Sequence, residues 1–243
     1  MADIRVSVAV ATYNGEKYIE EQIRSILSNL KECDEIVVSD DGSKDGTLRV
    51  VSLIADPRIR VVKGPGLGVK KNFENAIREC RGKYIFLCDQ DDIWASGKVD
   101  RVLEVFGQRK CPVVVHDCSV IDEKGNVLVD SFFDLKGSGA GVFKNILKNT
   151  YIGCCMAFDR ERLFDKVVPI PDTILMHDQW IGVIADLSGG SVFIPDKLIK
   201  YRRHGNNTWE FNKHFGFFTM LKNRIVFIKE LSKRRKELKR QTI

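Results

Sequence analysis

The sequence predicts an α/β fold with a doubly wound, mostly parallel sheet. Between residues 6 and 88, four short apolar runs alternate with segments of helical spacing, and polar or glycine residues follow each run. A strand inside a parallel sheet is covered on both faces and is therefore apolar throughout, whereas a surface helix shows apolar residues every three or four positions. Four such strands separated by helices favour a parallel sheet with helices on both faces, and the 243 residues suffice for one large domain.

The first half of the chain supplies the strands and helices of this sheet. The segment 16–28 is typical of its helices, because Ile19, Ile23 and Ile26 fall on one helical face. Strands are expected at residues 6–12, 35–39, 59–62 and 84–88, helices at 16–28, 47–55 and 69–80, and a glycine-rich loop at 64–68. Ligands of open α/β sheets bind beyond the carboxyl ends of the strands. The segments that follow the strands, at 12–15, 40–43, 64–68 and 89–92, therefore indicate one shared site.

The second half is less regular. Strands are expected at 112–117, within 149–158 and at 191–195, a helix at 177–187, and turns or loops at 122–126, 137–141 and 169–172. Between residues 217 and 240 the chain has apolar side chains at Leu221, Ile225, Ile228 and Leu231, at spacings of four, three and three. This spacing predicts an amphipathic helix at the end of the chain.

The net charge of +6 is concentrated in that last helix. Nine basic and two acidic residues between Lys222 and Arg240 give it a charge of +7, which leaves −1 for the rest of the chain. A basic amphipathic helix suits an anionic membrane surface. A helix that packs on the body of the protein, with a solvated end, explains the same pattern equally well.

Cysteine usage and the absence of long apolar runs indicate a cytosolic protein. The seven cysteines include no C-x-x-C pair, and several lie inside apolar runs, so we expect reduced and mostly buried thiols. Adjacent Cys154 and Cys155 are interpreted as core residues rather than a redox pair. No run of 18 apolar residues predicts a membrane span, and the first residues lack a signal-peptide pattern.

The stretch F-L-C-D-Q-D-D-I-W, residues 86–94, places three carboxylates directly after an apolar strand. Asp89 and Asp91 face the same side of an extended segment, because side chains alternate along it. Two carboxylates side by side repel unless a cation lies between them, and Mg²⁺ or Mn²⁺ fits carboxylate ligands. The alternative is a solvated acidic turn that caps the next helix. We expect Asp92 to be that cap and Trp94 to pack beneath the pair.

Two other strand ends carry residues suited to a nucleotide. Asp40 or Asp41 can accept hydrogen bonds from a base or a ribose, while the remaining polar residues there form a turn and a cap. The first strand ends in Thr12-Tyr13-Asn14-Gly15, without a G-x-G-x-x-G or Walker motif. Phosphate would therefore be held by a metal and by side chains. Lys71 and Asn72 could reach a nucleotide, although Lys71 could equally face solvent.

The stretch M-H-D-Q-W, residues 176–180, lies near a predicted helix start. Asp178 is either a helix cap or a general base, in which case Trp180 offers a stacking face to a sugar. Three roles remain open for His204. It could be a metal ligand, a phosphate contact beside Arg202 or Arg203, or a surface histidine.

In combination these motifs resemble the family 2 glycosyltransferases. A-T-Y-N-G-E-K-Y, S-D-D-G-S-K-D-G-T, G-V-K-K-N-F-E-N-A-I, G-K-Y-I-F-L-C-D-Q-D-D-I-W-x-x-x-K and M-H-D-Q-W occur in the order that the family shows, over roughly residues 5–206. The D-Q-D-D-I-W and M-H-D-x-W forms are similar to bacterial rhamnosyltransferase-like members. The resemblance implies the GT-A fold, with a glycosyltransferase domain over residues 1–210 and a basic helical tail over 211–243. Within the domain it implies a nucleotide-binding half (1–110) and an acceptor-side half (111–210).

The resemblance also implies a role for each motif. The ion on the diphosphate would be bound by Asp91, with Asp89 and His204 as further candidates, and Asp178 would be the catalytic base. Gly153 to Met156 would border the sugar and acceptor pocket. His177 is a departure, because some relatives carry a bulky apolar or acidic residue there. The expected nucleotide-binding residues are Thr12, Tyr13, Asn14, Glu16, Asp40, Asp41, Lys71, Asn72, Asp89 and Gln90, and the expected acceptor or sugar residues are Gly153, Cys154, His177 and Trp180.

The expected activity is the inverting, Mn²⁺- or Mg²⁺-dependent transfer of a hexose. The donor would be dTDP-rhamnose or a UDP-hexose, and the acceptor a glycan or lipid-linked sugar of a surface polysaccharide. No nucleic-acid partner is expected. The protein would be cytoplasmic. If the helix at residues 217–240 binds a membrane, the protein would also contact the inner face of the plasma membrane peripherally. Two rival functions are a nucleotidyltransferase, whose first loop is normally glycine-rich and basic rather than acidic, and a non-catalytic nucleotide-sugar binding module.

Overall fold

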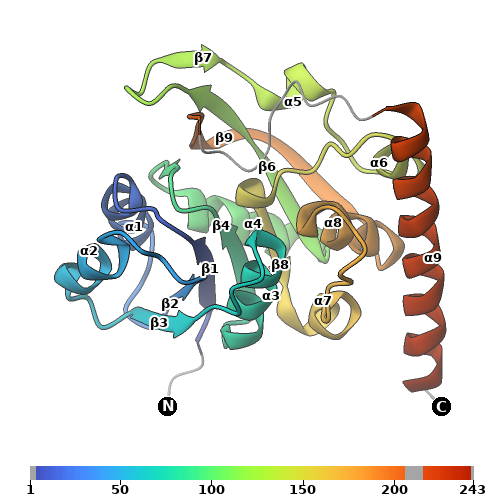
Figure 1. The fold of residues 1–243 in the computed structure, drawn as a ribbon, viewed down its shortest axis with the longest axis horizontal. Helices are drawn as coiled ribbons and strands as arrows, with labels where there is room; N and C mark the ends of the chain where they lie inside the picture. The colour runs from blue at the N-terminus through green and yellow to red at the C-terminus, as the bar shows by residue number, and fades with distance from the viewer. Residues whose placement is uncertain (1–3, 206–215, 242–243) are drawn as a thin grey trace.

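The computed structural model describes residues 4–205 and 216–241. Figure 1 shows a central sheet flanked by helices, with a long C-terminal helix standing along one side. The expected boundary between residues 1–210 and 211–243 falls among residues 206–215, outside the described residues.

The elements expected before residue 90 are all present, each within three residues of its expected ends. The strands are β1 (Val6–Thr12), β2 (Glu35–Asp40), β3 (Ile59–Lys63), β4 (Tyr84–Cys88), β5 (Ile93–Trp94), β6 (Val113–Ile121), β7 (Val127–Val129), β8 (Met156–Asp159) and β9 (Ser191–Arg202). The helices are α1 (Ile19–Leu27), α2 (Thr47–Ile54), α3 (Val69–Glu79), α4 (Lys98–Arg109), α5 (Phe132–Lys136), α6 (Val142–Leu147), α7 (Arg160–Val167), α8 (His177–Leu187) and α9 (Phe217–Gln241), with a 3-10 turn, η1, at Gly153–Cys155.

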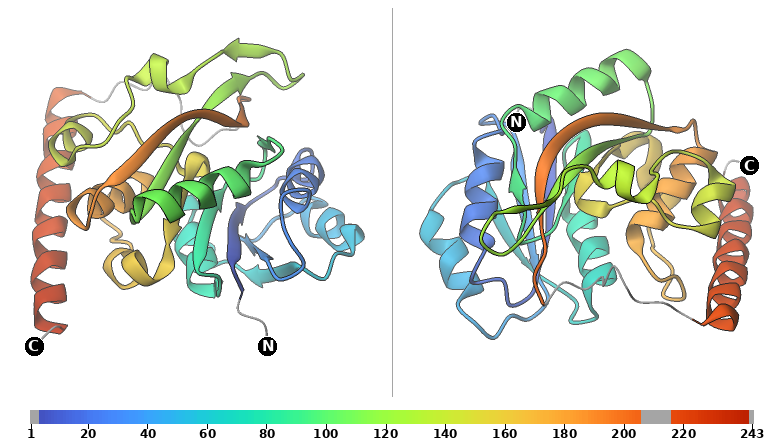
Figure 2. Two further views of the ribbon diagram at one scale, coloured as in Figure 1. Left: turned by 180° about the vertical axis from the view of Figure 1, so that it is seen from behind. Right: turned by 90° about the horizontal axis from the view of Figure 1, so that it is seen from above.

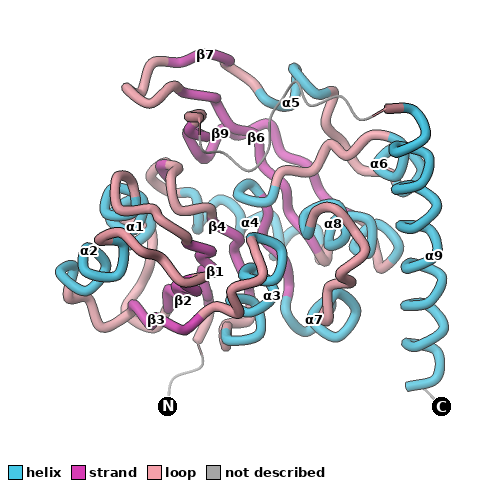
Figure 3. Tube along the Cα trace, in the orientation of Figure 1, coloured by secondary structure: helices cyan, strands magenta, loops and turns pink. Residues whose placement is uncertain are grey.

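The strands of the described residues form one sheet in the order β3-β2-β1-β4-β8-β6-β9-β5, with β7 paired to β6 (Figure 3). Strands β3, β2, β1 and β4 are parallel, as are β6 and β9. Strand β8 is antiparallel to both of its neighbours, and β5 and β7 are also antiparallel to theirs. The α/β prediction is confirmed, and the parallel pairing that it emphasised dominates the first half of the sheet.

Burial shows that β1 and β2 are interior strands of the sheet. Every residue of β1 and β2 is buried, as a strand covered on both faces requires. Helix α3 packs against β1 and β2, while α4 covers the opposite face, towards β6 and β9 (Figures 1 and 2). The carboxyl ends of β1, β2 and β4 consequently meet at one edge, where ligands of such sheets bind.

The chain beyond β4 corrects the expected role of Asp92. Strand β5 comes before the next helix, and α4 begins only at Lys98, after Gly97 in the left-handed region (φ 79°). Asp92 therefore cannot cap a helix. It is buried, and its Oδ1 accepts a hydrogen bond from the backbone N–H of Arg202 at 2.9 Å. Trp94 is buried as expected, with Nζ of Lys98 3.9 Å from its ring centre.

Helix α9 packs on the body through one face. Phe227 meets Trp180 of α8 edge-on, and the guanidinium of Arg234 donates to the carbonyls of Lys166 and Pro169 at 2.6 Å. Leu231 also packs inward. Phe218, Leu221, Ile225 and Ile228 are instead 84%, 43%, 45% and 48% exposed. Among the described residues, no helix combines the length and apolarity needed to cross a membrane.

Candidate active site

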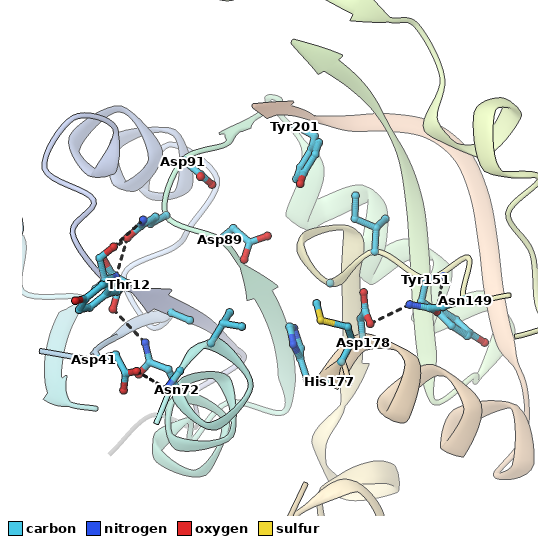
Figure 4. Close-up of a pocket in the computed structure, with 18 of the residues that line it drawn as sticks. Thr12, Asp41, Asn72, Asp89, Asp91, Asn149, Tyr151, His177, Asp178 and Tyr201 are labelled. Atoms are coloured by element: carbon cyan, nitrogen blue, oxygen red, sulfur yellow. Dashed lines mark hydrogen bonds between the residues drawn. The ribbon is translucent and has the colours of Figure 1, made fainter. Parts of the chain in front are cut away.

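A cavity of about 480 Å³ opens between the carboxyl ends of β1 and β4 and the first turn of α8 (Figure 4). Four carboxylates line it, from Asp41, Asp89, Asp91 and Asp178. They come from three separate parts of the chain, and the fold brings them to one place. The cavity therefore contains both the acidic strand ends and the residue expected to be a catalytic base.

The end of β1, on one side of the cavity, is held by Gln90 and Asn72. Oε1 of Gln90 accepts from Oγ1 of Thr12 at 2.6 Å and from the backbone N–H of Tyr13 at 2.9 Å, and its Nε2 donates to the Tyr13 carbonyl at 3.1 Å. Asn72 donates to the carbonyls of Thr12 and Ser39 at 3.1 and 2.8 Å. These bonds fix the end of β1 and leave the Tyr13 ring 54% exposed beside the cavity.

The two aspartates after β2 have different roles. Asp41 lines the cavity, and its two oxygens accept from the backbone N–H groups of Gly66 and Gly68 at 2.7 Å each. Both glycines have positive φ, of 71° and 85°, which lets the loop turn both N–H groups towards one carboxylate. Asp40 instead accepts from Gly42 and Ser43 and closes the turn.

Three other expected nucleotide-binding residues do not line the cavity. Asn14 and Glu16 accept hydrogen bonds from the backbone of the 44–46 turn, so they brace that turn. Nζ of Lys71 lies within 2.9 Å of Glu74, 2.8 Å of Asp172 and 2.7 Å of the Ile170 carbonyl. These partners hold Lys71 against the 170–172 loop rather than at the cavity or in open solvent.

The acidic end of β4 has the donors that a hard divalent ion requires. Oδ2 of Asp91 lies 2.7 Å from Nε2 of His204, which is 113 positions away in the sequence. The carboxylates of Asp89 and Asp92 and the sulfur of Cys154 lie within 4.8 Å of one another. Burial, followed by the charges of Asp91 and Asp178, raises the pKa of Asp89 to about 7. The carboxylate oxygens of Asp89, Asp91 and Asp92 are ligands of the kind that Mg²⁺ or Mn²⁺ prefers, whereas the Cys154 sulfur is not.

Asp178 lies across the cavity, in the first turn of α8. Its Oδ1 accepts from the backbone N–H of Gln179 at 2.5 Å and from Nδ2 of Asn149 at 3.1 Å. Burial raises the pKa of Asp178 to about 6, although these hydrogen bonds favour its charged form. A carboxylate with a pKa near 6 is charged at neutral pH and can accept a proton.

The structure corrects two of the expected sugar-side residues. Trp180 is fully buried, with its Nε1 bonded to the Val167 carbonyl at 2.9 Å, so it offers no face to a sugar. It lies two positions after Asp178, and residues two apart point to different sides of a helix. Cys154 is also fully buried, and only its neighbour Gly153 lines the cavity. His177 does line the cavity, beside Asp178 (Figure 4).

Sequence reasoning missed several residues that line the cavity from the second half of the chain, namely Lys136, Asn149, Tyr151 and Tyr201. Tyr151 donates from its hydroxyl to Asp186 at 2.7 Å and supports the segment that carries Asn149. None of these residues follows a strand of the parallel half, so the strand-end pattern gave no signal for them.

Comparisons with known proteins agree with this geometry. The family model for glycosyl transferase family 2 matches residues 7–164. TuaG of Bacillus subtilis, whose name assigns it to teichuronic acid biosynthesis, is 29% identical over 235 residues, which is 92% of this chain and 90% of TuaG. A glycosyltransferase of Rickettsia conorii, RC0461, is 31% identical over 82% of this chain but only 34% of its own length.

Solved structures share the fold. The structure of S. aureus TarS 1–349 with UDP-GlcNAc has a TM-score of 0.73 at 18% identity and covers 93% of this chain and 66% of that one. The mannosyltransferase PcManGT of Pyrobaculum calidifontis, solved with GDP-Man and Mn²⁺, has a TM-score of 0.62 at 21% identity and covers 84% and 58%. The chain thus spans less than two thirds of each of these solved chains. The fold is GT-A, and with the family model matching well over half of its length, the chain belongs to glycosyl transferase family 2.

Proposed function

We propose that this protein is an inverting, metal-dependent glycosyltransferase that uses a nucleoside-diphosphate sugar. The observation that carries this proposal is the position of Asp178, whose pKa is raised to about 6, in the same cavity as Asp89 and Asp91. A proton acceptor and a cation site thus face one space large enough for a sugar. TarS with UDP-GlcNAc and PcManGT with GDP-Man and Mn²⁺ support this class of donor.

The nucleotide side supplies binding rather than chemistry. The exposed ring of Tyr13 offers a stacking face to a base, while Asp41 lies where it can accept from base or ribose groups. Gln90 holds the Tyr13 backbone, and the N–H groups of Gly66 and Gly68 hold the Asp41 carboxylate. Asp91, with Asp89 and His204, would hold Mn²⁺ or Mg²⁺, and a bound ion would offset the charge of the leaving diphosphate.

Asp178 supplies the proton transfer. It accepts the proton of an acceptor hydroxyl while that oxygen attacks the anomeric carbon, which gains oxocarbenium character as the bond to the diphosphate breaks. Attack on the face opposite to the diphosphate inverts the anomeric configuration. We further propose a donor among dTDP-rhamnose and the UDP-hexoses, and a glycan or lipid-linked acceptor in surface polysaccharide synthesis. The similarity to TuaG supports that role.

We also propose that α9 touches the inner face of an anionic membrane while it packs on the body. Its outward face carries Phe218, Leu221, Ile225 and Ile228, with Lys222 and Lys229 beside them. Exposed apolar side chains flanked by lysines are typical of helices that lie in a membrane interface. A hollow of about 130 Å³ beside this helix, lined by Leu147, Met176 and other residues, shares Asn149 and Met176 with the main cavity.

Vesicle sedimentation tests the membrane contact without removing α9, whose inner face packs on Trp180. Replacing Leu221 and Ile225 with glutamate should abolish binding to phosphatidylglycerol vesicles. Leu53→Glu, on an exposed site of α2, is the matched control and should bind like the wild type. Equal sedimentation of all three proteins would remove the membrane proposal and leave the transferase proposal intact.

Calorimetry followed by a hydrolysis assay tests the transferase. The protein is titrated with a panel of nucleotides and nucleotide sugars with Mn²⁺ or Mg²⁺, and cleavage of the bound donor is then measured. Asp91→Asn should lose metal-dependent binding, whereas Asp178→Asn should bind the donor and lose transfer by about 10²- to 10⁴-fold. Binding without cleavage by the wild type would favour a non-catalytic module, and full transfer by Asp178→Asn would exclude Asp178 as the base.

A further inference from the structure

The imidazole of His177 lies on the cavity wall without a hydrogen-bond partner. The residue is 3% exposed, and neither ring nitrogen has a hydrogen-bond partner among the described residues. Buried polar groups in native proteins are nearly always paired, so an unpaired imidazole at a cavity requires an explanation. Figure 4 shows the ring beside Asp178, on the side of the cavity that faces Asp89.

Packing fixes the position of this ring. It stacks on Phe73, with ring centroids 4.1 Å apart and planes inclined by 23°. On another side it meets the backbone of Gly153, where an added Cβ would lie only 2.8 Å from Nε2. The absence of a side chain at Gly153 thus leaves room for the imidazole. The ring is held from both sides, as a preorganised binding group should be.

The ring is neutral under ordinary conditions. Burial, followed by the charge of Lys70, lowers the pKa of His177 to about 3. A neutral imidazole offers one N–H donor and one acceptor nitrogen. A sugar hydroxyl also donates and accepts, so it can pair with either nitrogen without bringing a charge into the site.

We propose that His177 is a specificity-determining residue that hydrogen-bonds a sugar hydroxyl in the cavity. This inference rests on the proposed function, because it assigns a polar contact within the same sugar-binding space. An apolar residue at position 177 would leave such a hydroxyl unpaired, and a carboxylate would add a fifth acidic group to the cavity. The hydroxyl belongs either to the donor sugar or to the acceptor sugar. In the first case donor binding depends on His177, and in the second case acceptor binding does.

The test compares the wild type with His177→Phe, which keeps an aromatic ring on Phe73 and removes both nitrogens. Calorimetry with Mn²⁺ measures Kd for UDP, UDP-GlcNAc, UDP-glucose and dTDP-rhamnose, and steady-state assays measure kcat/KM for a set of p-nitrophenyl glycosides as acceptors. If the hydroxyl belongs to the donor, Kd of the preferred nucleotide sugar weakens about tenfold or more while Kd of its nucleoside diphosphate stays constant. If it belongs to the acceptor, donor affinity is unchanged and kcat/KM for the acceptor falls by a similar factor.

A second comparison separates a sugar contact from a purely structural role. Deoxy analogues of the responding sugar should lose affinity with the wild type, and the analogue lacking the contacted hydroxyl should bind the wild type and His177→Phe equally. His116→Phe is the matched control, since it also replaces a buried imidazole but lies outside the cavity. Unchanged donor and acceptor parameters in folded His177→Phe would overturn the inference. A wild type that cleaves no nucleotide sugar would instead overturn the proposed function.

Discussion

Asn149 should set the pH at which Asp178 works, and Asn149→Ala tests this. Nδ2 of Asn149 lies 3.1 Å from Oδ1 of Asp178 and favours its charged form. A hydrogen bond to a charged group contributes about 1.5 kcal/mol at the lower end of its range. One pKa unit corresponds to about 1.36 kcal/mol, so losing this bond should raise the pKa of Asp178 by about one unit.

The sign of the effect follows from the role of the carboxylate as a base. Only the charged form accepts a proton, so kcat/KM should fall as the pH drops through the pKa, which is about 6 in the wild type. In Asn149→Ala the same fall should occur near pH 7. At pH 6 the variant should then be about fivefold slower than the wild type, and at about pH 8.5 the two should be nearly equal.

The assay is a pH profile of kcat/KM for donor hydrolysis at one saturating Mn²⁺ concentration. Every protein is measured with the same ion, so a shift of one pH profile relative to another reflects the substitution alone. Asn75→Ala is the control, since Asn75 is also half-buried but bonds to Ser39 and Lys63. A profile of Asn149→Ala that overlays the wild type after scaling would refute the link between Asn149, Asp178 and proton transfer.

Three further predictions address the rest of the site. Trp180→Ala should lower the free energy of unfolding by about 3–5 kcal/mol in urea titrations and leave donor selectivity unchanged, whereas altered selectivity would reinstate Trp180 as a sugar contact. Gly153→Ala should reduce kcat/KM because its Cβ collides with the His177 imidazole, and wild-type kinetics would show that the ring has room to move. Removing divalent ions with EDTA should weaken donor binding in calorimetry, and Mn²⁺ should restore it; binding that is indifferent to EDTA would contradict a metal site at Asp91.

The strand ends of the first half were predictable because their signal is local. Each strand from β1 to β4 is a short apolar run, and a parallel sheet aligns the carboxyl ends of its strands. Thr12, Asp41, Asp89 and Asp91 therefore reach one cavity as expected. Asp40 and Asp41 are adjacent, and only the bonds to the glycine loop distinguish the cavity residue from the turn residue.

The acceptor side was less predictable because long-range pairing decides it. Strand β9 continues past Pro195 to Arg202 and pairs with β6, with register shifts at Asp117 that no short pattern reveals. The contact between Asp91 and His204 spans 113 positions, and Asn149 meets Asp178 across 29. Trp180 shows the limit of motif reading, since its helix turns it into the core although Asp178, two positions earlier, lines the cavity.

Inversion at the anomeric carbon tests most directly whether the two sides of the cavity act together. Proton NMR of donor hydrolysis identifies the anomer that forms first, before mutarotation. With an α-linked donor such as UDP-GlcNAc or UDP-glucose, whichever is cleaved, the wild type should release the β-sugar first, and Asp178→Asn should release it at least about a hundredfold more slowly. Release of the α-sugar first, or an Asp178→Asn rate equal to the wild type, would contradict attack directed by Asp178.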